Sequence, residues 1–164
     1  MNTGSKLRLY AFCNFYMNSI SQGIQTAHVV GRMAKFYRKR DGDAANLFWQ
    51  WLEEGVENET IIVCNGGMGA DISDAYYKYE NVLTKEGIPS QIFYEESRAF
   101  GTNEPAPTCW ACVLSEEVYN AKSFPDNLGN QRFFHNGNEG VIAYKKTHQM
   151  FDFLMYKNGC GLAK

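Results

Sequence analysis

Three side chains that suit acid–base chemistry or ligand binding lie close together on one short stretch of the chain. Gln25, Thr26 and His28 occupy neighbouring positions on the first turns of a predicted helix, and their polar groups are expected to face the end of a strand. An imidazole changes its charge near neutral pH, so His28 is a candidate general base, ligand or cap. The alternative is a structural histidine that Gln25 or the backbone orients.

A glycine-rich loop provides a second candidate site. It consists of Asn65, Gly66, Gly67, Met68 and Gly69, and it separates a β-branched run from a predicted helix. Unblocked backbone N–H groups at a helix N-terminus suit phosphate or another anion. The loop matches neither a Walker sequence nor a full dinucleotide fingerprint. The alternative is a tight turn that needs one glycine with positive φ.

The segment Glu95–Arg98 follows another predicted strand and pairs carboxylates with a guanidinium. Placed beside His28 and the glycine loop, these groups would suit acid–base catalysis or the recognition of a purine or a phosphate. A surface ion pair between Arg98 and Glu96 is the alternative. The basic residues Arg32–Arg40 at the helix end also have two explanations, because they suit both the helix dipole and a phosphate-binding patch.

The expected elements place these candidates at neighbouring strand ends. Strands are predicted at residues 6–13, 60–64, 91–95 and 109–114, and helices at 22–40, at 44–54 and through Ile72–Leu83. This alternation predicts an α/β sheet with helices on its faces, and ligands in such sheets bind beyond the carboxyl ends of strands. The β-branched composition of residues 60–64 predicts a central strand that is buried on both faces.

Composition limits the classes of function. The 164 residues fit one domain, and a net charge of −2 disfavours an extended nucleic-acid partner. We expect a soluble cytoplasmic protein, because no apolar stretch is long enough to span a bilayer and no signal-peptide core is evident. The five cysteines are expected to be reduced structural thiols. Cys109 and Cys112 would point to opposite faces of a strand, so neither a metal site nor a cofactor is predicted.

The pattern across roughly residues 6–114 resembles the second type of peptidyl-tRNA hydrolase, the archaeal and eukaryotic kind. The family's Gln-x-Ala-His motif appears as Gln25-Thr-Ala-His28, and its strand and polar loop are similar to Ile92–Thr108, which ends in Ala-Pro-Thr. The resemblance implies catalytic roles for His28 and Glu95. It also places Gln25, Arg98 and Thr108 in the ligand site.

The chain departs from that family at three functional positions. The family's lysine falls on Ser21 or Gln22, its loop aspartate on Glu95 and its following threonine on Ala99, whereas the arginine is kept as Arg98. Loss of the lysine and the hydroxyl removes a phosphate or carbonyl partner and a proton-relay group. These changes favour a scaffold whose chemistry has diverged.

The chain is also similar to a family of small, early tailed-phage proteins that are assigned to the same fold. The likeness lies in the Gln-Gly-Ile-Gln-x-Ala-His segment at residues 22–28 and in a C-terminal extension. It implies a protein of the host-cell cytoplasm that interferes with host defence.

Together these observations predict a three-layer α/β/α domain with a mixed four-stranded sheet over residues 1–116. Residues 117–164 are expected to pack on it as an extension, with a helix at Thr147–Lys157, and to close the pocket or mediate oligomerisation. The favoured function is the binding of a small nucleotide-like ligand, which is sequestered or degraded. The alternatives are peptidyl-tRNA or related ester hydrolysis by His28 and Glu95, and a protein-interaction module that binds a host protein through the extension.

Overall fold

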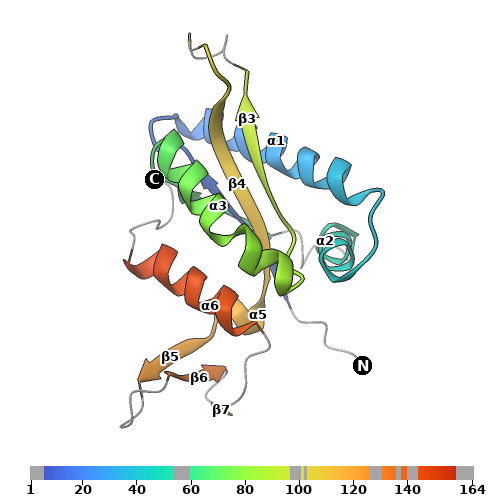
Figure 1. Cartoon of the computed structure of the whole chain (residues 1–164), viewed down its shortest axis with the longest axis vertical. Helices are drawn as coiled ribbons and strands as arrows, with labels where there is room; N and C mark the ends of the chain where they lie inside the picture. The colour runs from blue at the N-terminus through green and yellow to red at the C-terminus, as the bar shows by residue number, and fades with distance from the viewer. Residues whose placement is uncertain are drawn as a thin grey trace.

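Four strands form the central sheet of the protein, whose computed structural model describes residues 6–53, 60–96, 101, 103–125, 131–135, 138–139 and 144–157 (Figure 1). The strands lie in the order β2-β1-β4-β3. Strand β1 runs parallel to β2 and antiparallel to β4, and β4 is antiparallel to β3. The carboxyl ends of β1, β2 and β3 therefore meet at one end of the sheet, beside the start of β4. The bounds are β1 (Leu7–Cys13), β2 (Thr60–Asn65), β3 (Ser90–Glu95) and β4 (Ala106–Ser115).

Helices cover both faces of the sheet and make three layers (Figure 1). Helices α1 (Ser19–Tyr37) and α2 (Asp43–Glu53) lie on one face, and α3 (Gly69–Lys85) and α6 (Lys145–Asp152) lie on the other. The short helix α5 (Glu116–Tyr119) follows β4, and a π-helical segment, Phe153–Lys157, extends α6. The predicted three-layer fold with a mixed four-stranded sheet is confirmed. None of the described helices is both long and apolar enough to cross a membrane.

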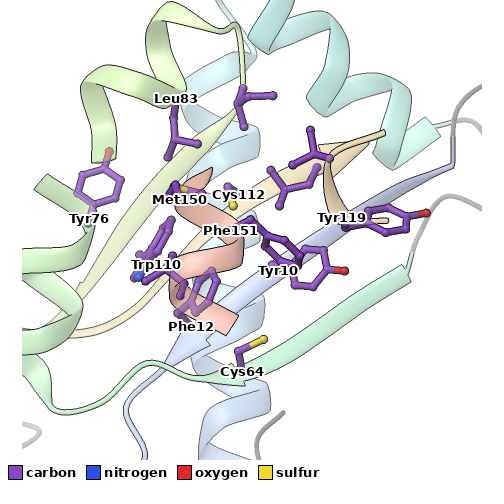
Figure 2. Close-up of a cluster of buried hydrophobic side chains, with 14 of the residues drawn as sticks. Tyr10, Phe12, Cys64, Tyr76, Leu83, Trp110, Cys112, Tyr119, Met150 and Phe151 are labelled. Atoms are coloured by element: carbon purple, nitrogen blue, oxygen red, sulfur yellow. The ribbon is translucent and has the colours of Figure 1, made fainter. Parts of the chain in front are cut away.

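Strands β1 and β4 supply two hydrophobic cores, because successive side chains of a strand point to opposite faces. Leu9 and Ala11 face α1 and α2, whereas Tyr10 and Phe12 face α3 and α6. Figure 2 shows the second of these cores, in which the rings of Phe12 and Trp110 stack with their centroids 4.4 Å apart. Burial of each such side chain contributes roughly 1.5 to 3 kcal/mol.

Strand β2 corrects one expectation. It lies at the edge of the sheet and is mostly half-buried, with Ile61 43% exposed, so the prediction of a central, doubly buried strand was wrong. The doubly buried strands are the two central ones, β1 and β4, and in β4 every residue from Thr108 to Ser115 is buried. A β-branched composition shows that a segment fits a pleated surface, but it does not report how many neighbours the strand has.

The C-terminal segment completes the second core. Met150, Phe151 and Leu154 are buried there against strand residues, and the expected helix at 147–157 is present as α6 and its π-helical extension. The carboxylate of Glu86, just after α3, accepts hydrogen bonds from the backbone N–H groups of Lys146 and Thr147, at 3.1 and 2.8 Å. A negative charge at a helix N-terminus is stabilising, so the end of α3 fixes the start of α6.

A second, antiparallel sheet has no counterpart in the sequence predictions. Its strands lie in the order β5-β6-β7, and their bounds are β5 (Lys122–Pro125), β6 (Gln131–His135) and β7 (Asn138–Glu139). Asn, Gly and Pro in this region indicate turns, and strands of two to five residues are too short to show a reliable alternation.

Candidate functional site

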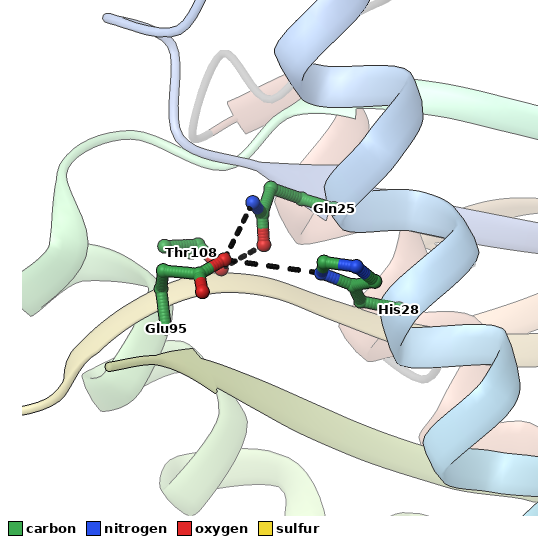
Figure 3. Close-up of polar contacts among 4 residues, drawn as sticks. All are labelled: Gln25, His28, Glu95 and Thr108. Atoms are coloured by element: carbon green, nitrogen blue, oxygen red, sulfur yellow. Dashed lines mark hydrogen bonds and ion pairs between the residues drawn. The ribbon is translucent and has the colours of Figure 1, made fainter. Parts of the chain in front are cut away.

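Helix α1, β3 and β4 bring four polar side chains together beyond the strand ends (Figure 3). The Gln25 Nε2 donates a hydrogen bond to the Glu95 Oε2 at 2.9 Å, and the Thr108 hydroxyl donates one to the Gln25 Oε1 at 2.8 Å. The His28 Nδ1 lies 3.8 Å from the same Glu95 oxygen. Because Thr108 occupies the amide oxygen of Gln25, the amide nitrogen is directed at Glu95. We call Gln25, His28, Glu95 and Thr108 the strand-end site.

Exposure rises from the base of this site to its surface. Thr108 and Gln25 are 1% and 7% exposed, whereas the side chains of Glu95 and His28 are 22% and 45% exposed. The ring of Phe93 lies beside the imidazole, with 4.8 Å between the centroids. Buried polar groups cost stability unless they are hydrogen-bonded, and here they bond to each other. The arrangement is a fixed buried support under a solvent-accessible carboxylate and imidazole.

The carboxylate favours the tautomer of His28 that carries its proton on Nδ1. The Nε2 lone pair is then free to accept a proton, which is the role of a general base. At 3.8 Å the Nδ1 and Oε2 atoms are too far apart for a hydrogen bond, and the contact is an ion pair only when the imidazole is protonated. A shift of about 1 Å would bring Nδ1 and Oε2 within hydrogen-bond range, and catalytic contacts of this kind often tighten only when substrate binds.

The predicted ligand residues at the start of α1 support the loop before the helix. The Gln22 Nε2 donates to the carbonyl oxygen of Met17 at 3.1 Å, and Gln22 is buried. The backbone N–H of Ser21 donates to the side chain of Asn18, which caps the helix. Gln22 therefore holds the β1–α1 connection in place and does not face solvent, while Ser21 is half-buried beside the cap.

The glycine-rich loop lies next to this connection, but its first backbone donors already bond to groups of the protein. The N–H of Gly66 donates to Cys13, that of Gly67 to the Asn65 side chain, and that of Met68 to the Asp71 carboxylate, at 2.7, 2.9 and 2.8 Å. These hydrogen bonds favour the tight-turn interpretation of Asn65–Gly69 over a phosphate cradle.

Steric limits explain the glycines of this loop. A Cβ on Gly66 would lie 2.8 Å from the backbone of Phe12, and Gly67 has a φ of +81°. A Cβ on Gly69 would lie 3.3 Å from the Pro107 oxygen, so this glycine allows α3 to start close to β4. Arg98, the predicted cation, lies outside the described residues, as does Ala99. The role of Arg98 stays a prediction.

A buried thiol pair beneath the strand-end site was missed by the sequence analysis. The sulfur atoms of Cys13 and Cys109 lie 3.2 Å apart, and the Cys13 sulfur is 3.3 Å from the Thr26 hydroxyl. The hydrogen bond with Cys109 lowers the pKa of the Cys13 thiol, while burial raises the pKa of Cys109. These cysteines are directly opposite in the β1–β4 register, which only the strand order could have indicated.

The described cysteines are buried on both sides of the sheet. Cys13, Cys64, Cys109 and Cys112 are buried, and none of them forms a disulfide with another described residue. Cys109 faces α1 and α2, and Cys112 faces α3 and α6, so the prediction of opposite faces is confirmed. Among the described residues, no three His, Cys, Asp or Glu side chains are grouped as a metal ion would require.

Comparison with known proteins does not assign a function, so the geometry of the strand-end site is the basis for a proposal. No family model matches the sequence, and no curated protein sequence matches it either. The resemblances to type II peptidyl-tRNA hydrolases and to tailed-phage proteins therefore stay predictions.

Proposed function

We propose that the protein hydrolyses an ester bond in a small substrate, with His28 as general base and Glu95 as the carboxylate that orients it. The observation that carries this proposal is the hydrogen-bonded chain from Thr108 through Gln25 to Glu95, beside an accessible imidazole. These hydrogen bonds fix one carboxylate oxygen of Glu95 next to the imidazole before any substrate binds. Preorganised groups of this kind are typical of catalytic sites.

The chemistry follows from the two groups. The His28 Nε2 takes a proton from a water molecule, and the oxygen of that water attacks the ester carbonyl carbon. The imidazolium that forms is stabilised by the Glu95 carboxylate. The bond from the carbonyl carbon to the leaving oxygen then breaks, and the imidazolium returns its proton to that oxygen. The products are an acid and an alcohol, and His28 ends neutral.

A purely structural role explains this arrangement less well. An exposed ion pair contributes only about 0 to 1 kcal/mol to folding, and His28 is nearly half exposed. The amide of Gln25 and the hydroxyl of Thr108 are buried, but each of their hydrogen bonds adds only the ordinary stabilisation of about 0.5 to 1.5 kcal/mol. The four residues therefore contribute little to the free energy of unfolding, although their hydrogen bonds hold them in a defined arrangement.

The test is turnover of peptidyl-tRNA and of a panel of small acyl esters by the purified chain. His28→Gln should lower kcat/KM by roughly 100-fold or more, the usual contribution of a general base. Glu95→Gln should cause a smaller loss, because the neutral amide no longer stabilises the imidazolium. Glu96→Gln is the matched control: Glu96 is the adjacent, exposed carboxylate, and its loss should leave turnover unchanged. Equal turnover in the parent and in His28→Gln would overturn the proposal.

A second candidate is a protein that holds a small nucleotide-like ligand without cleaving it, as a phage protein that sequesters a host-defence signal would. The observation that favours it is the 3.8 Å separation of His28 and Glu95, which leaves the pair without a hydrogen bond. Mass spectrometry of small molecules released by denaturing the protein purified from infected cells separates the two. An intact nucleotide supports sequestration, and a cleaved one supports hydrolysis.

A further inference from the structure

Two adjoining cavities lie away from the strand-end site, where the C-terminal half of α1 meets α2, α3 and the start of β3. The more enclosed cavity has a volume of about 260 Å³ and the more open one about 700 Å³. Phe36, Arg40 and Gln91 line both, so the two spaces are neighbours. Figure 1 shows α2 beside the C-terminal end of α3 at this end of the sheet.

The enclosed cavity has aromatic walls and acidic groups. Tyr37 and Tyr76 line it, together with the carboxylates of Asp41 and Glu80. The Tyr37 hydroxyl is fixed by Ser90, because it donates to the Ser90 oxygen at 3.3 Å and accepts from the Ser90 N–H at 3.0 Å. Burial raises the pKa of both tyrosines, so their rings stay neutral. Pockets for whole small molecules start at roughly 300 Å³, so this volume suits one planar ring system.

The open cavity is basic. Arg32, Lys35, Lys39 and Arg40 line it, the first two from α1 and the last two from the segment just after the helix ends at Tyr37. The guanidinium of Arg40 stacks on the ring of Phe36, 3.8 Å from its centroid. Within the described ranges, no carboxylate oxygen lies within 4.0 Å of these cations. Arg32 and Lys35 are three residues apart on α1, where like charges repel one another, and a bound anion would relieve this repulsion.

The helix dipole does not account for this arrangement. Its effect falls off within the last turn, whereas Arg32 lies five residues before Tyr37, the last residue of α1. The dipole also gives no reason for a cavity between the cations. Arg38 shows the difference, because it is a basic residue at the same helix end that lines neither cavity.

We propose that the two cavities form a binding site for a nucleotide with two or more phosphates. The base lies against Tyr37 and Tyr76, where Asp41 and Glu80 accept hydrogen bonds from its amino group. The phosphates lie on Arg32 and Lys35 of α1 and on Lys39 in the turn that follows it. Four cations match the charge of a di- or triphosphate better than that of a monophosphate. The proposal concerns binding alone, and it holds whether or not the strand-end site cleaves a substrate.

Isothermal titration calorimetry with ATP, GTP and CTP tests this site, with tripolyphosphate and adenosine as partial ligands. At least one nucleotide should bind about tenfold or more tightly than either partial ligand, because only the nucleotide fills both cavities. The double variant Lys35→Gln/Lys39→Gln should weaken that binding by about tenfold or more through loss of charge-assisted contacts. The control Arg38→Gln removes a charge from the same helix end and should change it by less than about twofold.

A cavity-filling variant tests the base-binding half separately. Ala44 lines the enclosed cavity and is half-buried, so Ala44→Leu should lower nucleotide affinity to that of tripolyphosphate while leaving tripolyphosphate binding unchanged. Thermal melting confirms that each variant is folded. Equal losses in Arg38→Gln and in the double lysine variant would overturn the proposal, as would the absence of nucleotide binding up to about 1 mM. Ester turnover by the parent and nucleotide binding by the double lysine variant are measured separately, so failure of the hydrolysis proposal is a separate outcome.

Discussion

His28 and His148 lie on opposite faces of the sheet and have opposite surroundings. The side chain of His28 is 45% exposed and faces a carboxylate, whereas His148 on α6 is 1% exposed and its Nδ1 lies 2.9 Å from the Val118 carbonyl oxygen. One imidazole is accessible and supported by buried polar groups, and the other is part of the packing. Both layers pack a hydrophobic core against the sheet, but the layer of α1 and α2 also carries the candidate chemistry, whereas the histidine of the α3 and α6 layer is part of the packing.

The largest effect that this comparison predicts is on the α6 side. Phe151→Ala removes a buried ring that packs edge-on against Tyr10, with 4.8 Å between the centroids. We expect the free energy of unfolding to fall by about 3 to 5 kcal/mol. Urea denaturation followed by tryptophan fluorescence measures it. A loss below about 1 kcal/mol would mean that α6 is only loosely attached, and the comparison of the layers would fail.

The two histidines themselves give a direct test. His148→Ala should cost roughly 2 to 4 kcal/mol, because it opens a cavity and removes a hydrogen-bond partner of the Val118 carbonyl. His28→Ala removes an exposed side chain and should cost less than about 1 kcal/mol. Parallel thermal melts of the two variants decide the point. Similar losses would show that His28 is also a structural residue.

A smaller effect is expected from Gln25, the positioning residue of the strand-end site. Gln25→Leu keeps the size of the side chain but breaks the link between Thr108 and Glu95, at a cost of about 1 to 3 kcal/mol for the unpaired groups. If hydrolysis occurs, kcat should fall more than KM rises, because the carboxylate loses its orientation. If a folded Gln25→Leu variant keeps the kcat of the parent, the hydrogen bonds from Thr108 through Gln25 to Glu95 do not contribute to the reaction.

Much of the fold was predictable because the relevant signals are local. The helical spacing of residues such as Val30, Ala34 and Tyr37 indicated α1, and short apolar runs indicated the four strands. The position of β2 was not predictable, since the strand order depends on contacts between distant segments. Strands β5 to β7 were not predicted for a different reason: they are short, and the residues around them favour turns.

The strand-end site was predictable only in part. Gln25 and His28 are neighbours on one helix, which the sequence shows directly. Their approach to Glu95, 70 residues beyond Gln25, requires β3 to lie beside α1. The pairing of Cys13 with Cys109 likewise requires β1 to lie next to β4. The hydrogen bonds of the glycine loop depend on atomic positions that no sequence pattern specifies.

The capping of α6 by Glu86 bears on the order in which the chain can fold during synthesis. The strands of the central sheet and α3 are complete once Ser115 has been made, but α6, which covers the rest of the face that α3 packs on, begins 30 positions later, at Lys145. At about 5 to 20 residues per second, translation of that interval takes roughly 2 to 6 seconds. During this time the part of this face that α6 covers, which includes Tyr10, is exposed and available to chaperones. Glu86 has already been synthesised by then, so its carboxylate can accept the backbone hydrogen bonds of the first turn of α6 as that helix forms.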